Sequence, residues 1–132
     1  MKFNLSWDEF VEYGDVSFGS WWDHVPEWWA QRDEPNVLFL KYEDMKKDLK
    51  GKVKTIADFI GHTLDEDDIQ KIAQATTIDS MIANTTQRKD QHFLRKGAVG
   101  DWKNHHTPAQ SKAADAAYFK AVEGIGLELD FE

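Results

Sequence analysis

The sequence has 132 residues, 41% of them hydrophobic and 30% charged, which suits one compact domain with its own core. The absence of cysteine excludes disulfides and cysteine-ligated metal sites, and a net charge of −8 argues against general nucleic-acid binding. No stretch approaches the roughly 20 apolar residues that span a bilayer, and the first residues lack the apolar run of a signal peptide. We therefore expect a cytoplasmic protein without membrane or nucleic-acid partners.

The N-terminal part of the chain predicts two helices. Ser6 and Glu9 match a capping box that would start a short helix at Trp7, ending near Gly14. A second helix is expected after Ser20, where apolar residues recur at helical spacing around a proline that should kink or shorten it. Burial in a core is the favoured interpretation of this stripe, and an aromatic substrate pocket is the alternative. The stripe consists of Trp21, Trp22, Val25, Trp28 and Trp29.

The segment Asn36–Tyr42 predicts a β-strand buried on both faces, because its residues are apolar without alternation. No second convincing parallel strand follows, so the backbone groups of this strand would lack partners within the chain. We therefore expect a mostly helical chain whose one buried strand belongs to a larger parallel sheet.

Helices are predicted along most of the remaining sequence. One should run from about Leu49 to Ile60, stopped by Gly61, and another should follow the acidic run Asp65–Asp68, whose carboxylates suit a helix N-terminus. A short helix capped by Thr77 should reach about Ala83. A final helix is expected to end near Glu123, before Gly124, and its start is marked by Thr107, Pro108 and Gln110.

Residues 84–99 form a long segment without periodicity, and loops of that length are usually functional or disordered. The segment 86–105 carries five basic and two acidic residues, a net +3, which leaves −11 for the remainder of the chain. Such a cationic segment in an acidic protein indicates a discrete anionic ligand, with an ordinary solvated loop as the alternative. Arg95 offers a bidentate fork, Lys96 a compact charge and Gly97 an unobstructed backbone N–H, a combination suited to a phosphomonoester.

Other chemical sites receive little support. The five histidines lack metal-ligand spacing, so no metal is expected, and the GxxxxGK, GxGxxG and GxSxG patterns are absent. Glu43 and Asp44 follow the predicted strand, where active groups of α/β folds gather, but capping of the next turn is the favoured role.

Four blocks of the sequence resemble the PAPS-dependent cytosolic sulfotransferases, which transfer a sulfonate group from 3′-phosphoadenosine 5′-phosphosulfate (PAPS) to a hydroxyl or amine acceptor. RKGAVGDWKNHHT resembles the family's C-terminal signature RKGxxGDWKxxFT, with His106 replacing the phenylalanine. The other three blocks lie upstream and follow one another in the same order as in the family: SFGSWWDHVPEWW, VLFLKYEDMKKDL, and IADFIG with QATTIDSM. The resemblance implies a P-loop-like sulfotransferase fold, a three-layer α/β/α parallel sheet of which residues 1–132 are the C-terminal portion.

The same resemblance implies a metal-free site for PAPS or its product 3′-phosphoadenosine 5′-phosphate (PAP). Three residues of the signature would bind the 3′-phosphate, two would flank the nucleotide, and three from upstream blocks would face the adenine. Ile78 among them stands where the family often has an aromatic ring, so adenine affinity should be weaker. Residues 84–92 match the mobile segment that covers the acceptor pocket. In these three groups, the implied site residues are Arg95, Lys96 and Gly97; Phe93 and Leu94; and Tyr42, Thr76 and Ile78.

The family's catalytic groups match nothing in this sequence. Its phosphosulfate loop, histidine base and an arginine–serine pair lie in the N-terminal half, and none of the five histidines here matches that base. We therefore expect a sulfotransferase part with no catalytic residue, inactive until paired with the missing half. The alternative is a catalytically inactive, truncated sulfotransferase serving as a nucleotide-binding or protein-interaction module that can self-associate. An unrelated helical protein is a third reading, and Pro108 and Lys112 depart from the family's dimer motif.

Overall fold

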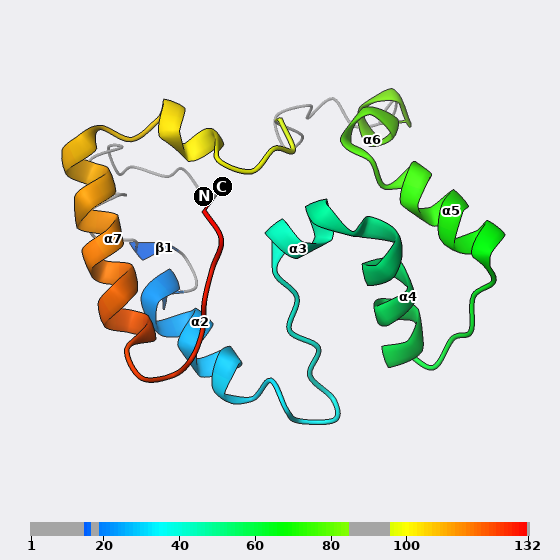
Figure 1. The fold of residues 1–132 in the computed structure, drawn as a ribbon, viewed down its shortest axis with the longest axis horizontal. Helices are drawn as coiled ribbons and strands as arrows, with labels where there is room; N and C mark the ends of the chain where they lie inside the picture. The colour runs from blue at the N-terminus through cyan, green and yellow to red at the C-terminus, as the bar shows by residue number, and fades with distance from the viewer. Residues whose placement is uncertain (1–14, 17–18, 85–95, 132) are drawn as a thin grey trace. The chain divides into compact units, whose positions relative to one another are not determined.

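The structure is a computed structural model that describes residues 15–16, 19–84 and 96–131 (Figure 1). The chain divides into two compact units, which we consider separately. Unit 1 contains residues 1–39 and 102–130, and unit 2 contains residues 40–101 and 131–132. The short helix predicted to start at Trp7 lies outside the described residues.

Unit 1 is built on two helices, α2 (Trp21–Ala30) and α7 (Pro108–Val122), which pack against each other. Before α2, the two-residue strands β1 (Asp15–Val16) and β2 (Gly19–Ser20) pair antiparallel. The 3₁₀ helix η2 (Asp101–Asn104) precedes α7 in the chain.

Helix α2 begins where the sequence predicts. The Ser20 side chain accepts the Trp22 N–H at 3.1 Å, which satisfies one of the donors left unpaired at a helix start. Pro26 lies within the helix without ending it.

The expectation that the tryptophan stripe forms a core is wrong. Trp21 and Trp28 are 37% and 46% exposed, whereas Trp22 and Trp29 are half-buried. In the described part of unit 1, the main helical partner of α2 is α7. A single neighbouring helix covers one side of a wide stripe and leaves the other side in solvent.

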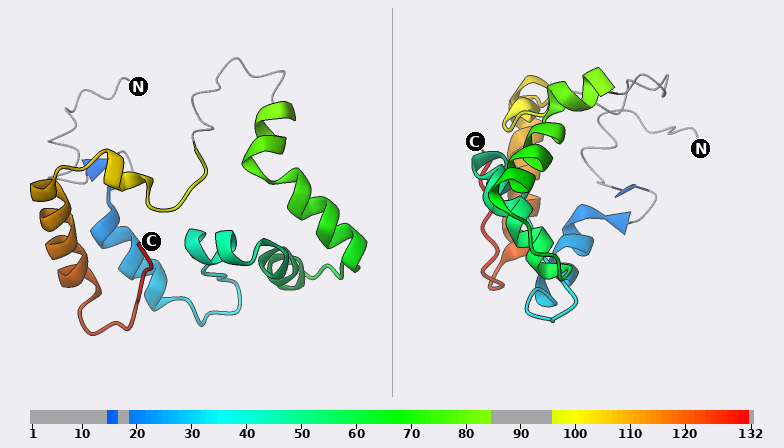
Figure 2. Two further views of the ribbon diagram at one scale, coloured as in Figure 1. Left: turned by 45° about the horizontal axis from the view of Figure 1, so that its top comes forward. Right: turned by 90° about the vertical axis from the view of Figure 1, so that its right-hand side faces the viewer.

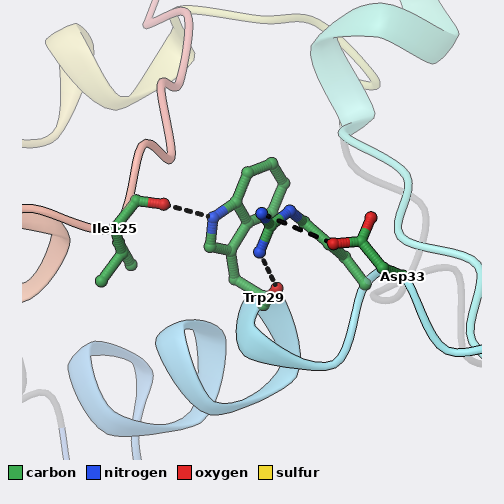
Figure 3. A network of polar contacts seen from close by, with 4 residues as sticks. Trp29, Asp33 and Ile125 are labelled. Atoms are coloured by element: carbon green, nitrogen blue, oxygen red, sulfur yellow. Dashed lines mark hydrogen bonds and ion pairs between the residues drawn. The ribbon is translucent and has the colours of Figure 1, made fainter.

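The segment after α7 supplies the best-buried residue of unit 1. Leu127 is 2% exposed and Tyr118 is 7% exposed. The Tyr118 hydroxyl donates to the Leu127 carbonyl at 3.3 Å and accepts the Leu129 N–H at 3.1 Å. The Trp29 indole N–H donates to the Ile125 carbonyl at 2.9 Å (Figure 3). Residues 125–129 are thus attached to both helices.

The start of α7 confirms the predicted capping box. Thr107 Oγ1 accepts the Gln110 N–H at 3.3 Å, Gln110 Oε1 accepts the Thr107 N–H at 2.8 Å, and Pro108 is the first helical residue.

Unit 2 consists mainly of α3 (Tyr42–Lys47), α4 (Leu49–Phe59), α5 (Glu66–Ala75) and α6 (Ile78–Asn84). Helices α4 and α5 pack against each other, and both are drawn in green shades in Figure 2. The buried residues of the two helices are Val53 and Ala57 in α4 and Ile69 and Ala73 in α5. The three helices predicted between residues 49 and 83 are therefore confirmed.

The strand predicted at Asn36–Tyr42 does not form. Residues 37–41 adopt no regular secondary structure, the Val37 N–H donates to the Glu34 carbonyl at 3.0 Å, and Tyr42 already begins α3. A strand needs a hydrogen-bonded neighbour, and the described residues supply none for this segment.

Gly61 ends α4 as predicted, in the left-handed conformation at φ +80°. Its N–H donates to the Asp58 carbonyl at 3.1 Å, and the His62 N–H donates to the Ala57 carbonyl at 2.8 Å. This pair of bonds is the Schellman arrangement, which satisfies carbonyls that the helix leaves unpaired. None of the helices in the described part of the chain is long and apolar enough to cross a membrane.

Removing the cap of α5 should measurably destabilise unit 2. Asp65 accepts the Asp68 N–H at 2.8 Å, so Asp65→Ala should lower the free energy of unfolding by about 1 kcal/mol. Asp67→Ala is the matched control, because it removes a carboxylate from the first turn of α5 without removing the N-cap. Urea denaturation followed by far-UV circular dichroism compares the two, and equal losses would show that charge, not capping, is responsible.

Candidate functional site

A pocket of about 810 Å³ opens in unit 2 and is lined by residues of α3, α4, α5 and α6. Four of the predicted site residues line it, and they come from four places in the sequence. Tyr42 begins α3, Thr76 follows α5, Ile78 begins α6 and Gly97 lies in the segment after α6. Most of the remaining wall is apolar, and α4 contributes the largest share of it.

The corner between α5 and α6 is fixed by two threonines. Thr76 Oγ1 donates to the Ile72 carbonyl at 2.9 Å, and Thr77 Oγ1 donates to the Gln74 carbonyl at 3.0 Å. Thr77 Oγ1 also accepts the Ser80 N–H at 3.3 Å, so the predicted cap of α6 is confirmed. This corner places Ile78, the first residue of α6, at the pocket wall.

Gly97 lies directly against Ile78. Its φ is +61°, a conformation that glycine adopts without the steric cost that a Cβ brings. A Cβ on Gly97 would lie 3.1 Å from Ile78 Cβ and 3.2 Å from Ile78 Cγ1, closer than nearly all real contacts. The backbone of the candidate phosphate loop is therefore in contact with the wall of the pocket.

Lys96, the neighbour of Gly97 in the chain, forms an ion pair with Asp101. Lys96 Nζ donates to Asp101 Oδ1 at 2.7 Å. The Asp101 side chain is only 5% exposed, whereas that of Lys96 is 60% exposed. The loop between them therefore presents a cation to solvent and keeps the matching anion inside.

Comparison with known proteins identifies the family. The family model described as the sulfotransferase domain matches residues 1–126. The chain belongs to the sulfotransferase family. The resemblance carried by the RKGAVGDWKNHHT segment and the blocks upstream of it is therefore confirmed.

Curated sulfotransferases match nearly the whole chain. Sulfotransferase 1C2 of Oryctolagus cuniculus is 42% identical over 96% of this chain and 48% of its own length. Sulfotransferase 1C2 of Homo sapiens is 38% identical over the same shares. This sulfotransferase chain thus spans about half the length of the curated relatives that it matches.

Solved structures confirm the fold class. Mouse sulfotransferase SULT7A1, crystallised in complex with PAP, superposes with a TM-score of 0.80 at 35% identity. The superposition covers 90% of this chain and 48% of the SULT7A1 chain. Retinol dehydratase, in complex with androsterone and the inactive cofactor PAP, superposes with a TM-score of 0.82 at 30% identity. The superposition covers 92% of this chain and 38% of the retinol dehydratase chain. The sulfotransferase chain has the fold of part of these proteins.

The structure brings together only some of the residues that the family resemblance implies. Tyr42, which is 47% exposed, lines the pocket together with Thr76, Ile78 and Gly97, and Lys96 is the neighbour of Gly97 in the chain. Arg95, Phe93 and Leu94 lie outside the described residues, as does most of segment 84–92. Among the described side chains, no three histidine, aspartate or glutamate residues gather as a metal site requires.

Two features of the site were missed from the sequence. Val53 and Ile56 belong to a helix that the sequence predicts, but the sequence did not indicate that they line a pocket. Periodicity marks a helix face as apolar but does not distinguish packed core from pocket wall. Asp101 was counted only as a charge, because opposite charges five residues apart in a loop follow no regular spacing. Glu43 and Asp44 lie in the first turn of α3, where their charge suits a helix N-terminus, but no side chain caps this helix, so the favoured capping role is wrong.

Proposed function

We propose that this chain is the C-terminal, nucleotide-binding portion of a PAPS-dependent sulfotransferase. The observation that carries the proposal is the gathering of Tyr42, Thr76, Ile78 and Gly97 around one pocket. Lys96, whose side chain is 60% exposed, precedes Gly97 in the chain. The PAP complexes of two structural neighbours support PAP as the ligand. The co-substrate would be PAPS, and the acceptor would be a small molecule with a hydroxyl or amine group.

The chemistry of the described residues suits the two ends of PAP. The 3′-phosphate is an anion, which the ammonium of Lys96 and the backbone N–H of Gly97 would bind, joined by the guanidinium of Arg95. The adenine is a flat and largely apolar ring system, which the aliphatic wall around Ile78 would cover. Phe93 and Leu94 would flank the nucleotide beside the phosphate loop.

The proposed chemical step needs a base and cations. The acceptor oxygen or nitrogen bonds to sulfur, the bond from sulfur to the 5′-phosphate oxygen breaks, and PAP leaves with the electron pair. A base takes the acceptor proton, and cations stabilise the leaving phosphate. The family resemblance assigns both to the N-terminal half. We therefore propose that this chain has no catalytic residue and gives no turnover alone.

A second candidate function is an inactive interaction module. Large apolar side chains are exposed in both units, with Trp28 at 46%, Phe119 at 66% and Ile60 at 61%. Exposed apolar surface of this kind favours association, either with itself or with the missing half. Sedimentation analysis separates the possibilities, because a monomeric chain that binds PAP would exclude self-association.

Titration of the full chain with PAP tests the proposed function. Lys96→Ala should weaken PAP binding by about 10- to 100-fold, the loss expected for one charged hydrogen bond of about 1.5–3 kcal/mol. Lys71→Ala is the matched control, because it removes another exposed, aspartate-paired lysine of unit 2 that lies in α5, outside the candidate phosphate loop. Binding followed by heteronuclear NMR reaches weak affinities. Absence of PAP binding at millimolar concentration, or equal losses in both variants, would contradict the proposal.

A further inference from the structure

We infer that Asp101 is a positioning residue for nucleotide binding, holding the ammonium of Lys96 at the place where the 3′-phosphate of PAP binds. This inference rests on the proposed function. Asp101 would act through Lys96 and would not itself touch the ligand, since a carboxylate and a phosphate repel each other.

The two partners of the Lys96–Asp101 ion pair differ strongly in burial. Three other lysine–aspartate pairs occur in the described part of unit 2, three or four residues apart, and each of their aspartates is at least 37% exposed: Lys41–Asp44, Lys54–Asp58 and Lys71–Asp68. The carboxylate of Asp101 is only 5% exposed. Burying a carboxylate is costly unless hydrogen bonds and a counter-charge compensate for the lost water. The Lys96 ammonium, at 2.7 Å, provides such a counter-charge.

The exposed partner keeps its binding capacity. An ammonium group carries three N–H donors, and its bond to Asp101 Oδ1 uses one of them. The Lys96 side chain is 60% exposed, so its ammonium remains accessible to an anionic ligand. A free lysine side chain loses rotamer freedom when it binds a phosphate, whereas a lysine already held by Asp101 has lost part of that freedom beforehand.

The backbone between the two residues is shaped for this contact. Gly97 and Gly100 both adopt positive φ, +61° and +79°, and the chain turns back so that residues 96 and 101 meet. Asp101 then begins η2, which gives the carboxylate a fixed position on a regular element. The same turn sets Gly97 against Ile78. One ion pair therefore links the exposed cation to the turn that contacts the pocket wall.

The negative charge of Asp101 also opposes nucleotide binding, because it weakens the attraction between the Lys96 ammonium and an incoming phosphate. That repulsion is screened by water around the exposed ammonium, while the hydrogen bond to the buried carboxylate is not. We therefore expect the positioning effect to exceed the repulsion, so that removing the charge of Asp101 weakens PAP binding.

Substitution with an amide of the same shape tests the inference. Asp101→Asn should weaken PAP binding by about fivefold, within the range of coupling between contacting residues. It should leave the affinity for adenosine 5′-monophosphate, which lacks the 3′-phosphate, unchanged. In a Lys96→Ala background, Asp101→Asn should have no further effect on PAP affinity. Asp58→Asn, the matched removal of an exposed lysine partner, should leave both affinities unchanged.

Each contrary result has a distinct meaning. If Lys96→Ala weakens PAP binding but Asp101→Asn does not, the positioning role is wrong and the proposed function stands. If Asp101→Asn weakens PAP binding equally with and without Lys96, or weakens both nucleotides equally, its role is structural and the inference is overturned. If the unsubstituted chain fails to bind PAP, the proposed function fails and the inference with it.

A measurement on the unsubstituted chain keeps the inference testable should Asp101→Asn fail to fold. Protons of the Lys96 ammonium should exchange with water more slowly than those of Lys71, whose aspartate partner is 50% exposed. Side-chain NMR of the ammonium groups compares the two, and equally fast exchange would overturn the inference.

Discussion

Replacing Leu127 with alanine is expected to lower the free energy of unfolding of unit 1 by about 2–5 kcal/mol, the cost of truncating a buried leucine. Leu127 is 2% exposed, less than any other buried hydrophobic residue of the described chain. Its carbonyl accepts the Tyr118 hydroxyl at 3.3 Å, so the substitution would leave a cavity beside a hydrogen bond that attaches the C-terminal segment. That segment has no helix or strand of its own to hold its shape.

Tryptophan fluorescence during urea denaturation gives a selective measurement, because residues 40–101 and 131–132 of unit 2 contain no tryptophan. Phe119→Ala is the control in the same unit, since it removes a larger apolar side chain that is 66% exposed. We expect a loss below about 1 kcal/mol for that variant. A loss for Leu127→Ala no greater than for Phe119→Ala would show that the C-terminal segment does not stabilise unit 1.

Local chemistry made the helices predictable from the sequence. The caps at Ser20, Asp65 and Thr107 each bond to a donor two or three residues away, so neighbouring residues alone determine where the helix begins. The Gly61 stop is equally local. Contacts between residues far apart in the sequence have no comparable local pattern from which to predict them. Trp29 and Ile125 are 96 residues apart, and no spacing rule anticipates their bond.

The two failures of the fold prediction share one physical cause. The apolar run in residues 37–41 and the tryptophan stripe of α2 were both interpreted as buried, which requires a neighbour on each side. The described residues provide no strand beside the first and mainly one helix beside the second. Sequence pattern reveals that a surface is apolar, but whether that surface is covered depends on which other elements are present.

The site was predictable only in part from residue chemistry. Arg95, Lys96 and Gly97 indicated an anion by their functional groups, whereas Tyr42, Thr76 and Ile78 were singled out only through the family resemblance. The structure places four of these six, namely Tyr42, Thr76, Ile78 and Gly97, at one pocket, because the α5–α6 corner and the turn after α6 converge. No local pattern encodes that convergence.

Gly97→Ala is expected to weaken PAP binding by more than tenfold. Two separate costs oppose an alanine there. Its φ of +61° lies in the left-handed region, which costs a residue with a Cβ about 1–2 kcal/mol. The new methyl group would also lie 3.1 Å from Ile78 Cβ, and overpacking of this kind typically costs about 1–3 kcal/mol. The loop would then occupy its binding conformation less often, and the apparent affinity falls with that occupancy.

Gly100→Ala separates the two costs, because Gly100 has a φ of +79° but a Cβ there would meet only the Phe131 carbonyl, at an ordinary 4.0 Å. This variant should show the backbone cost alone. PAP titrations of both variants should therefore differ by about the overpacking cost, up to roughly tenfold or more. Equal affinities would mean that Ile78 yields without penalty. The contact between the phosphate loop and the pocket wall would then contribute nothing to nucleotide binding, and the left-handed turn alone would account for the glycine.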